Sequence, residues 1–121
     1  GDATGTFPLA PARPVCQHPA TMRPLRLALA ASEVAPFAKT GGLADVLLGL
    51  GRWLGQKGQK GPGHDVRLFL PFYRRIQKSD LKTTPLPGAQ AIDVRFPNRT
   101  IRFSIRTAPL PQSEVPVYFV D

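Results

Sequence analysis

A lysine, two glycines and an aspartate lie close together in the first half of the chain: Lys39, Gly41, Gly42 and Asp45. The first turn of a helix offers unpaired backbone N–H groups and a partial positive charge, and glycines let an anion approach the main chain closely. A lysine adds a mobile full charge. If a strand ends and a helix begins at this point, these residues form part of a diphosphate site.

Each of these residues also has a simpler explanation. Two glycines before a helix more often relieve steric crowding than bind a ligand, and most lysines are solvated surface residues. Asp45 could serve only to complement the helix dipole. The spacing matches neither the Walker loop nor the dinucleotide pattern G-x-G-x-x-G. From the residues alone, an anion site and a purely structural helix start are both open.

The segments around these residues predict a strand followed by a helix. Residues 25–31 form a short apolar run that fits a buried parallel strand, and Pro36 keeps the next helix from starting early. Thr40 or Gly41 would cap that helix. Its apolar side chains recur at helical spacing and predict the buried face: Leu43, Val46, Leu47, Leu50 and Leu54.

A second strand is predicted over residues 66–70, which end at Pro71. Strand, helix and strand in this order are typical of a βαβ unit with parallel strands, whose ligands bind at the carboxyl ends of the strands. Lys39 would lie at that edge. Gly49 and Gly51 each weaken the connecting helix by about 1 kcal/mol relative to alanine, so its length depends on packing against the sheet.

Beyond Pro71 the pattern becomes antiparallel. Apolar and polar residues alternate over 92–96 and again over 101–106, which predicts a hairpin whose strands each have one solvated face. Residues 115–120 are apolar and are expected to rejoin the parallel sheet. We therefore predict an α/β fold, a partial Rossmann-like parallel sheet with an inserted β-hairpin.

Length and charge limit the classes of function. The 121 residues make at most one small domain, and the net charge of +8 would suit nucleic acid, an acidic membrane or anionic metabolites. The basic residues are dispersed and no aromatic-rich RNA-binding motif accompanies them, so nucleic acid is not expected as the main partner. Cys16 is the single cysteine, which favours a reducing, cytoplasmic environment. No apolar run approaches the roughly 20 residues that span a bilayer.

Two domain segments are expected. Residues 1–24 contain five prolines and show no periodicity, which predicts a disordered leader or extension. Residues 25–121 would form one incomplete N-terminal Rossmann-like domain. His18 falls in the leader and His64 in the turn before the second strand, so neither is expected to be catalytic.

The run Ser-Glu-Val-Ala-Pro-Phe-Ala-Lys-Thr-Gly-Gly-Leu-Ala-Asp-Val at residues 32–46 resembles the start of bacterial glycogen synthases and plant starch synthases. The resemblance continues at Gly-His-Asp-Val-Arg (63–67) and Leu-Pro-Phe-Tyr (70–73), and more weakly to Asp121. It implies the N-terminal portion of a GT-B type glycosyltransferase, in which two Rossmann-like domains face a cleft.

The resemblance also implies a retaining hexosyltransferase that moves glucose from ADP-glucose to the non-reducing end of an α-1,4-glucan, with no metal or other cofactor. Lys39 would contact the sugar nucleotide, and Gly41 and Gly42 would bring the main chain close to the diphosphate and the transferred sugar. Asp45 would have a catalytic, acceptor-side or positioning role. The other active-site residues belong to the missing second Rossmann-like domain, so the isolated chain is expected to be inactive. A plant origin would place the protein in plastids.

Two other hypotheses stay open at this point. In the first, the chain is a non-catalytic module that holds anions or nucleic acid through its positive charge, and salt-dependent DNA binding that ignores ADP-glucose would favour it. In the second, the chain does not fold stably, because a partial sheet leaves an open edge and apolar faces exposed.

Overall fold

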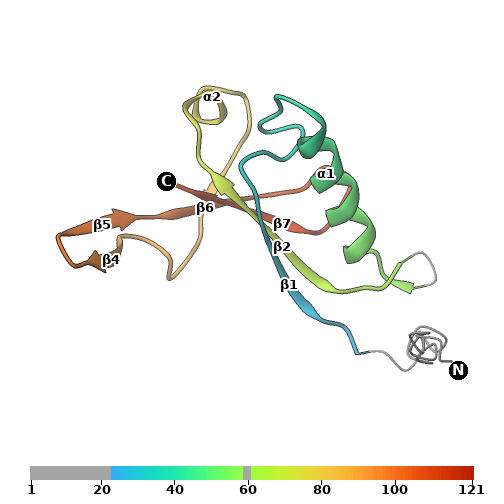
Figure 1. The fold of residues 1–121 in the computed structure, drawn as a ribbon. Coiled ribbons are helices and arrows are strands. Elements are labelled where there is room, and N and C mark those ends of the chain that lie inside the picture. The colour runs from blue at the N-terminus through green and yellow to red at the C-terminus, as the bar shows by residue number, and fades with distance from the viewer. Residues whose placement is uncertain (1–22, 59–60) are drawn as a thin grey trace, which may run out of the picture.

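The computed structural model describes residues 23–58 and 61–121, so the leader expected at residues 1–24 lies outside the described residues except for its last two. Two helices and seven strands follow one another in the described part (Figure 1): β1 (Arg26–Ala30), α1 (Gly42–Gly55), β2 (Asp65–Pro71), α2 (Arg74–Gln77), β3 (Thr84–Pro85), β4 (Ile92–Phe96), β5 (Arg99–Phe103), β6 (Ile105–Pro109) and β7 (Pro116–Val120).

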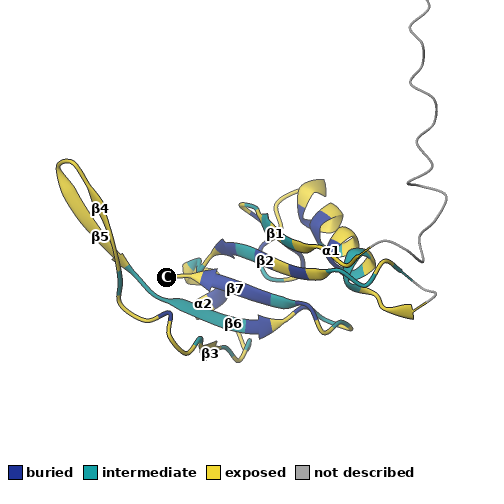
Figure 2. Cartoon of the chain, turned by 90° about the horizontal axis from the view of Figure 1, so that it is seen from below, coloured by how far each residue is buried: buried dark blue, intermediate teal, exposed yellow. Residues whose placement is uncertain are grey.

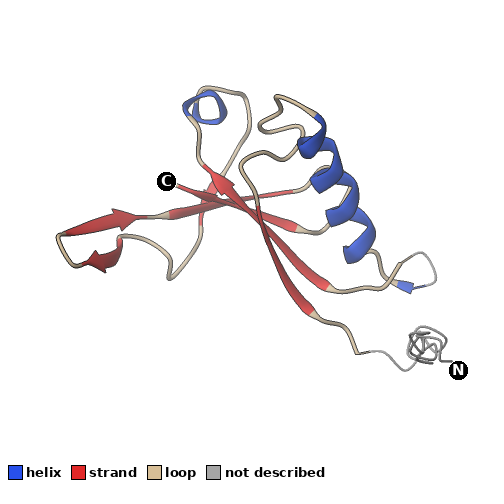
Figure 3. Cartoon of the chain, in the orientation of Figure 1, coloured by secondary structure: helices blue, strands red, loops and turns tan. Residues whose placement is uncertain are grey.

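Five of the strands form one sheet in the order β1-β2-β7-β6-β3, with α1 packed against it (Figure 3). β1, β2 and β7 run parallel, whereas β6 is antiparallel to β7 and β3 is antiparallel to β6. The predicted βαβ unit and the return of the last strand to the parallel sheet are confirmed. The α/β class is confirmed, with a mixed sheet in place of a purely parallel one.

β1 is not the buried strand that its apolar sequence predicted. Its residues alternate between exposed and half-buried, because β1 is the edge strand and pairs only with β2. In β2 the side chains of Val66, Leu68 and Leu70 are buried, whereas Asp65 and Arg67 on the opposite face are exposed. The main apolar core therefore lies on the face of the sheet that carries these three side chains, although Tyr118 of β7 is also buried on the opposite face.

The predicted helix is present, but its buried face is different from the predicted one. Leu47 is buried as expected and Leu54 is half-buried, yet Leu43, Val46 and Leu50 are exposed. The residues buried beside Leu47 are the small ones, Ala44 and Gly51. A Cβ on Gly51 would lie 3.1 Å from Leu68 and 3.3 Å from Leu110, and a Cβ on Gly55 would lie 2.6 Å from Val115. The glycines thus let α1 approach the sheet closely, and α1 keeps its full length of 14 residues.

The side chains on the solvent side of α1 include an apolar row at helical spacing. We call it the outer stripe: Leu43, Val46, Leu50 and Trp53. These side chains are between 41% and 59% exposed.

The predicted hairpin also exists, but it is not part of the main sheet. β4 and β5 pair only with each other, as a two-stranded arm that projects from the body and is almost entirely exposed (Figure 2). Phe96 faces Arg99 across the turn, so the loop is Pro97-Asn98 and not the four residues predicted. The apolar side chains Val94, Phe96 and Ile101 are exposed, so the expected burial of one face is wrong for the described structure.

In the described ranges, no helix is long and apolar enough to cross a membrane.

Candidate functional site

The segment that links β1 to α1 is an anchored loop at the carboxyl end of β1. Val34 and Ala38 are 0% and 1% exposed, and the N–H of Ala38 donates to the carbonyl of Val34 at 3.0 Å. The N–H of Ala35 donates to the carbonyl of Ala44 in α1 at 3.1 Å, and the ring of Phe37 meets Phe119 edge-on at 5.2 Å. These contacts fix the first half of the loop in the core.

The second half of the loop is exposed, and there the structure brings Lys39 and Asp45 together. The ammonium Nζ of Lys39 lies 2.8 Å from Oδ2 and 3.0 Å from Oδ1 of Asp45, in the first turn of α1. Both side chains are about half exposed, and exposed ion pairs contribute about 1 kcal/mol or less. A phosphate could therefore replace Asp45 as the partner of Lys39 at small cost.

Gly41 and Gly42 lie between Lys39 and Asp45, and nothing in the fold requires them to be glycine. Gly41 is the N-cap of α1 and has an extended backbone with φ −167°, which any residue adopts. A Cβ on either glycine would meet no atom within 4 Å. The steric explanation for the glycine pair is therefore wrong in this structure, whereas open space beside the main chain is what a bound anion needs.

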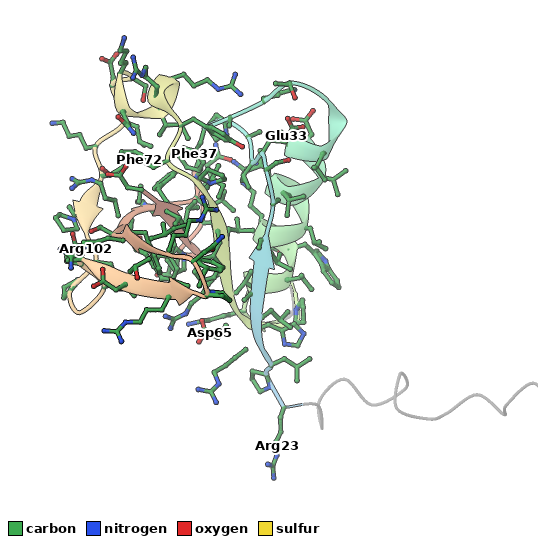
Figure 4. The ribbon with its side chains drawn as sticks, turned by 60° about the vertical axis from the view of Figure 1, so that its left-hand side comes forward. Arg23, Glu33, Phe37, Asp65, Phe72 and Arg102 are labelled. Carbon is green, nitrogen blue, oxygen red and sulfur yellow. The ribbon has the colours of Figure 1, made fainter. Side chains whose placement is uncertain are left out.

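We call residues 39–45 the exposed turn. A buried carboxylate, Glu33, connects this turn to the core, and the sequence analysis missed it. Glu33 is 8% exposed, and its Oε2 accepts hydrogen bonds from the N–H of Thr40, at 3.0 Å, and from the Thr40 hydroxyl. Its Oε1 accepts from the N–H of Ala44 at 3.2 Å. Figure 4 shows Glu33 beside the start of α1, at the opposite end of β1 from Asp65.

Of the two predicted helix caps, Gly41 takes the N-cap position of α1 and Thr40 does not. Gly41 has no side chain that could accept from the first turn, and Glu33 supplies that acceptor, because its carboxylate accepts from the N–H of Ala44. The hydroxyl of Thr40 donates to Glu33 instead of capping the helix. The hydroxyl of Thr40 lowers the pKa of the Glu33 carboxyl below its usual value, and the backbone N–H groups of Thr40 and Ala44 lower that pKa further, against the effect of burial. An acidic residue between the apolar run of residues 25–31 and the apolar pair Val34-Ala35 is the signal that could have identified it.

One hollow lies at the carboxyl ends of the parallel strands, and another lies at their amino ends. The first, of about 450 Å³, has a largely apolar lining and lies at the carboxyl ends of β1, β2 and β7, where Ala31 and Ser32 lead into the loop. The second, of about 280 Å³, lies at the opposite edge and includes His64 and Glu114. There Nδ1 of His64 accepts from the N–H of Leu25 at 2.9 Å, which is a structural role.

No group of three His, Cys, Asp or Glu side chains that could hold a metal ion occurs within residues 23–58 and 61–121.

Comparisons with known proteins agree on one family. The family of the starch synthase catalytic domain matches residues 26–121. A glycogen synthase of Syntrophotalea carbinolica is 42% identical over 100 residues, which are 80% of this chain and 18% of the relative. Glycogen synthase 1 of Geobacter metallireducens is 36% identical over 100 residues, 83% of this chain and 19% of the relative. The solved catalytic domain of starch synthase IV from Arabidopsis thaliana, bound to ADP and acarbose, superposes with a TM-score of 0.64 and 30% identity over 81% of this chain and 18% of that one.

The sheet, the loop and these relatives define a glycosyltransferase fold of the GT-B type. The chain belongs to the glycogen and starch synthase family, as its sequence motifs predicted. It spans less than a fifth of the length of the relatives described above.

Proposed function

We propose that this chain supplies the N-terminal, donor-binding part of a synthase that moves glucose from ADP-glucose to the non-reducing end of an α-1,4-glucan, with retention of configuration. The observation that carries the proposal is the glycine pair on an anchored loop, open to solvent and next to Lys39. The Arabidopsis neighbour was solved with ADP and acarbose, which supports a nucleotide donor and a glucan acceptor.

The chemistry of the loop fits this reaction. When the glycosidic bond to ADP breaks, negative charge develops on a phosphate oxygen, and preorganised donors stabilise that charge where it appears. Lys39 would exchange Asp45 for the phosphate, and the main chain at Gly41 and Gly42 would lie against the diphosphate and the sugar. Asp45, released from Lys39, would face the acceptor side. In this proposal the positive charge comes from the protein, and no metal ion or other cofactor takes part.

The proposal also requires more protein than these 121 residues. Since the chain spans 18% of the Syntrophotalea relative, we propose that it works as part of a longer polypeptide with a second Rossmann-like domain and is inactive alone. Glucose transfer from ADP-glucose to glycogen by the purified chain would contradict this part.

Replacing Lys39 tests the donor role. We define a chimeric synthase in which residues 26–121 of this chain replace the matching segment of the Syntrophotalea glycogen synthase. Lys39→Ala in that chimera should lower kcat/KM for ADP-glucose by about 100-fold or more, because a donor to developing charge is lost. The matched control is Lys82→Ala, which removes one positive charge at another exposed position. Equal kinetics of the two variants would refute the role of Lys39.

A further inference from the structure

We propose that Glu33 is a positioning residue for the proposed glucose transfer. Its carboxylate holds both ends of the Gly41–Gly42 turn, so that the exposed main chain is already in place when the diphosphate arrives. This inference rests on the proposed function and adds a residue that touches neither the donor nor the acceptor.

The two oxygens of Glu33 bridge the turn from one side to the other. Oε2 holds Thr40, the residue directly before the glycines, and Oε1 holds the N–H of Ala44, two residues after them. The carboxylate itself is fixed, because Glu33 is buried and the next residue, Val34, is 0% exposed. Glu33 therefore connects a rigid part of the core to the residues on both sides of the exposed glycine pair.

Few other contacts restrain the two glycines themselves, although Ala44 is also held by the N–H of Ala35. Two successive glycines have wide conformational freedom, and side-chain contacts at Gly41 and Gly42 are absent in the described structure. The ion pair between Lys39 and Asp45 is exposed and weak. Hydrogen bonds to a buried carboxylate are charge-assisted and stronger than neutral ones. The position of the turn therefore depends mainly on Glu33. This position matters for the transfer, because a displacement of about 1 Å in an active site can cost about 100-fold in rate.

The negative charge of Glu33 distinguishes a residue that positions the turn from one that attracts the diphosphate. A carboxylate beside the first turn of α1 offsets the positive end of the helix dipole, so it does not attract a diphosphate. Its removal should leave ground-state binding of ADP-glucose nearly unchanged and should lower the stabilisation of charge that develops later. The loss is therefore expected in kcat and not in KM.

Hydrogen exchange on the 121-residue chain tests the geometry without any activity. Glu33→Gln keeps the volume but replaces one acceptor oxygen by an NH2 group, which cannot accept. The amides of Thr40 and Ala44 should lose protection, at one of them by about tenfold or more. The amides of Leu68 and Val117 in the central strands should keep theirs. Unchanged protection at both Thr40 and Ala44 would overturn the proposal, and so would equal loss in the central strands, which would make Glu33 a determinant of overall stability.

Kinetics of the chimeric synthase test the consequence. Glu33→Gln should lower kcat about 10- to 100-fold, with KM for ADP-glucose within about threefold of its original value. The matched control, Glu114→Gln, makes the same change at an exposed site near the opposite edge of the sheet and should leave both constants unchanged. A rise in KM at constant kcat would make Glu33 a binding residue and overturn the proposal, as would unchanged kinetics. If the unsubstituted chimera transfers no glucose, the proposed function fails, and hydrogen exchange still decides whether Glu33 holds the turn.

Discussion

The glycines of α1 serve two different purposes, which their surroundings separate. A Cβ on Gly51 would lie 3.1 Å from Leu68 and 3.3 Å from Leu110, so a larger residue would require these side chains to shift. Gly42, at the start of the same helix, faces open space. Packing therefore explains Gly51. Gly42 lowers the helix propensity of α1 and no packing contact requires it, which is understandable if a ligand needs the space.

Replacing Gly42 by alanine should affect activity without harming the fold. The added methyl group meets no protein atom, and alanine favours a helix over glycine by about 1 kcal/mol, so thermal melting should stay equal or rise slightly. In the chimeric synthase, the same methyl should obstruct the diphosphate and lower kcat/KM for ADP-glucose about tenfold or more. Gly49→Ala, also in open space on α1, is the control. Full activity of Gly42→Ala would contradict close approach at this position.

The low pKa of Glu33 predicts a dependence of stability on pH. A carboxyl whose pKa is lower in the folded than in the unfolded chain stabilises the fold at pH values above its pKa in the unfolded chain, near 4.5. This contribution is lost as the pH falls through the pKa that the carboxyl has in the folded chain. Urea unfolding at pH 7, 5 and 3 should show a larger loss for the unsubstituted chain than for Glu33→Gln.

The comparison with Glu33→Gln also isolates this group from other carboxyls. Asp93 has a lowered pKa as well, because Arg102 donates to it, but it titrates in both proteins. The charged neighbours of the turn, Lys39 and Asp45, are likewise present in both. Identical pH dependence of the two proteins would show that Glu33 does not contribute in this range.

The sequence pointed to the residues of the exposed turn, whose role stays a prediction, but not to Glu33. Lys39 and Asp45 are close in sequence, and the structure brings them together in one ion pair. Glu33 meets Thr40 and Ala44 only because the loop folds back after entering the core at Val34. Tertiary packing determines that the loop folds back in this way, and the periodicity of apolar residues in the sequence does not predict it.

At the scale of elements, α1 shows why a helical period does not define a buried face. Leu43, Val46 and Leu50 satisfy the period as well as Leu47 does, and their apolar character favoured them. The sheet selects Ala44, Leu47 and Gly51, because small residues allow the closest approach of helix and strand. The apolar runs predicted β1, β2 and β7, whereas β3 was missed and the first residues of β6 were assigned to the second strand of the hairpin.

A matched pair of substitutions on α1 tests the close packing. Gly51→Val should destabilise the chain by about 1–3 kcal/mol, because its side chain enters the space held by Leu68 and Leu110. Gly49→Ala should stabilise it by up to about 1 kcal/mol, since its Cβ meets nothing. Urea unfolding of both variants gives the two free energies of unfolding. Equal values would show that α1 does not pack through Gly51.

The whole molecule has apolar surface on two sides. The outer stripe of α1 is exposed on one side of the sheet, and the arm of β4 and β5 carries exposed Val94, Phe96 and Ile101. Large exposed apolar patches often mark surfaces that contact another protein. Composition alone could not predict these exposed surfaces. An apolar fraction of 42% does not say which apolar side chains are buried and which stay exposed to solvent.

The outer stripe predicts self-association of the isolated chain. Sedimentation velocity should show oligomers that increase with concentration, and the double substitution Val46→Lys with Trp53→Lys should reduce them while circular dichroism stays unchanged. Gln56→Lys with Thr84→Lys adds the same charge at exposed polar positions and is the control. If both double variants associate equally, charge and not the stripe governs association.

The open space around Gly41 and Gly42 has a consequence for how variants of this family are sorted. Screens that rank sequences by yield, protease resistance or melting temperature register only damage that reaches the core. A side chain added at the glycine pair would pass every such screen with a normal or improved score. Libraries selected for robustness should therefore accumulate substitutions at the residues on which the proposed reaction depends, unless turnover itself is part of the selection.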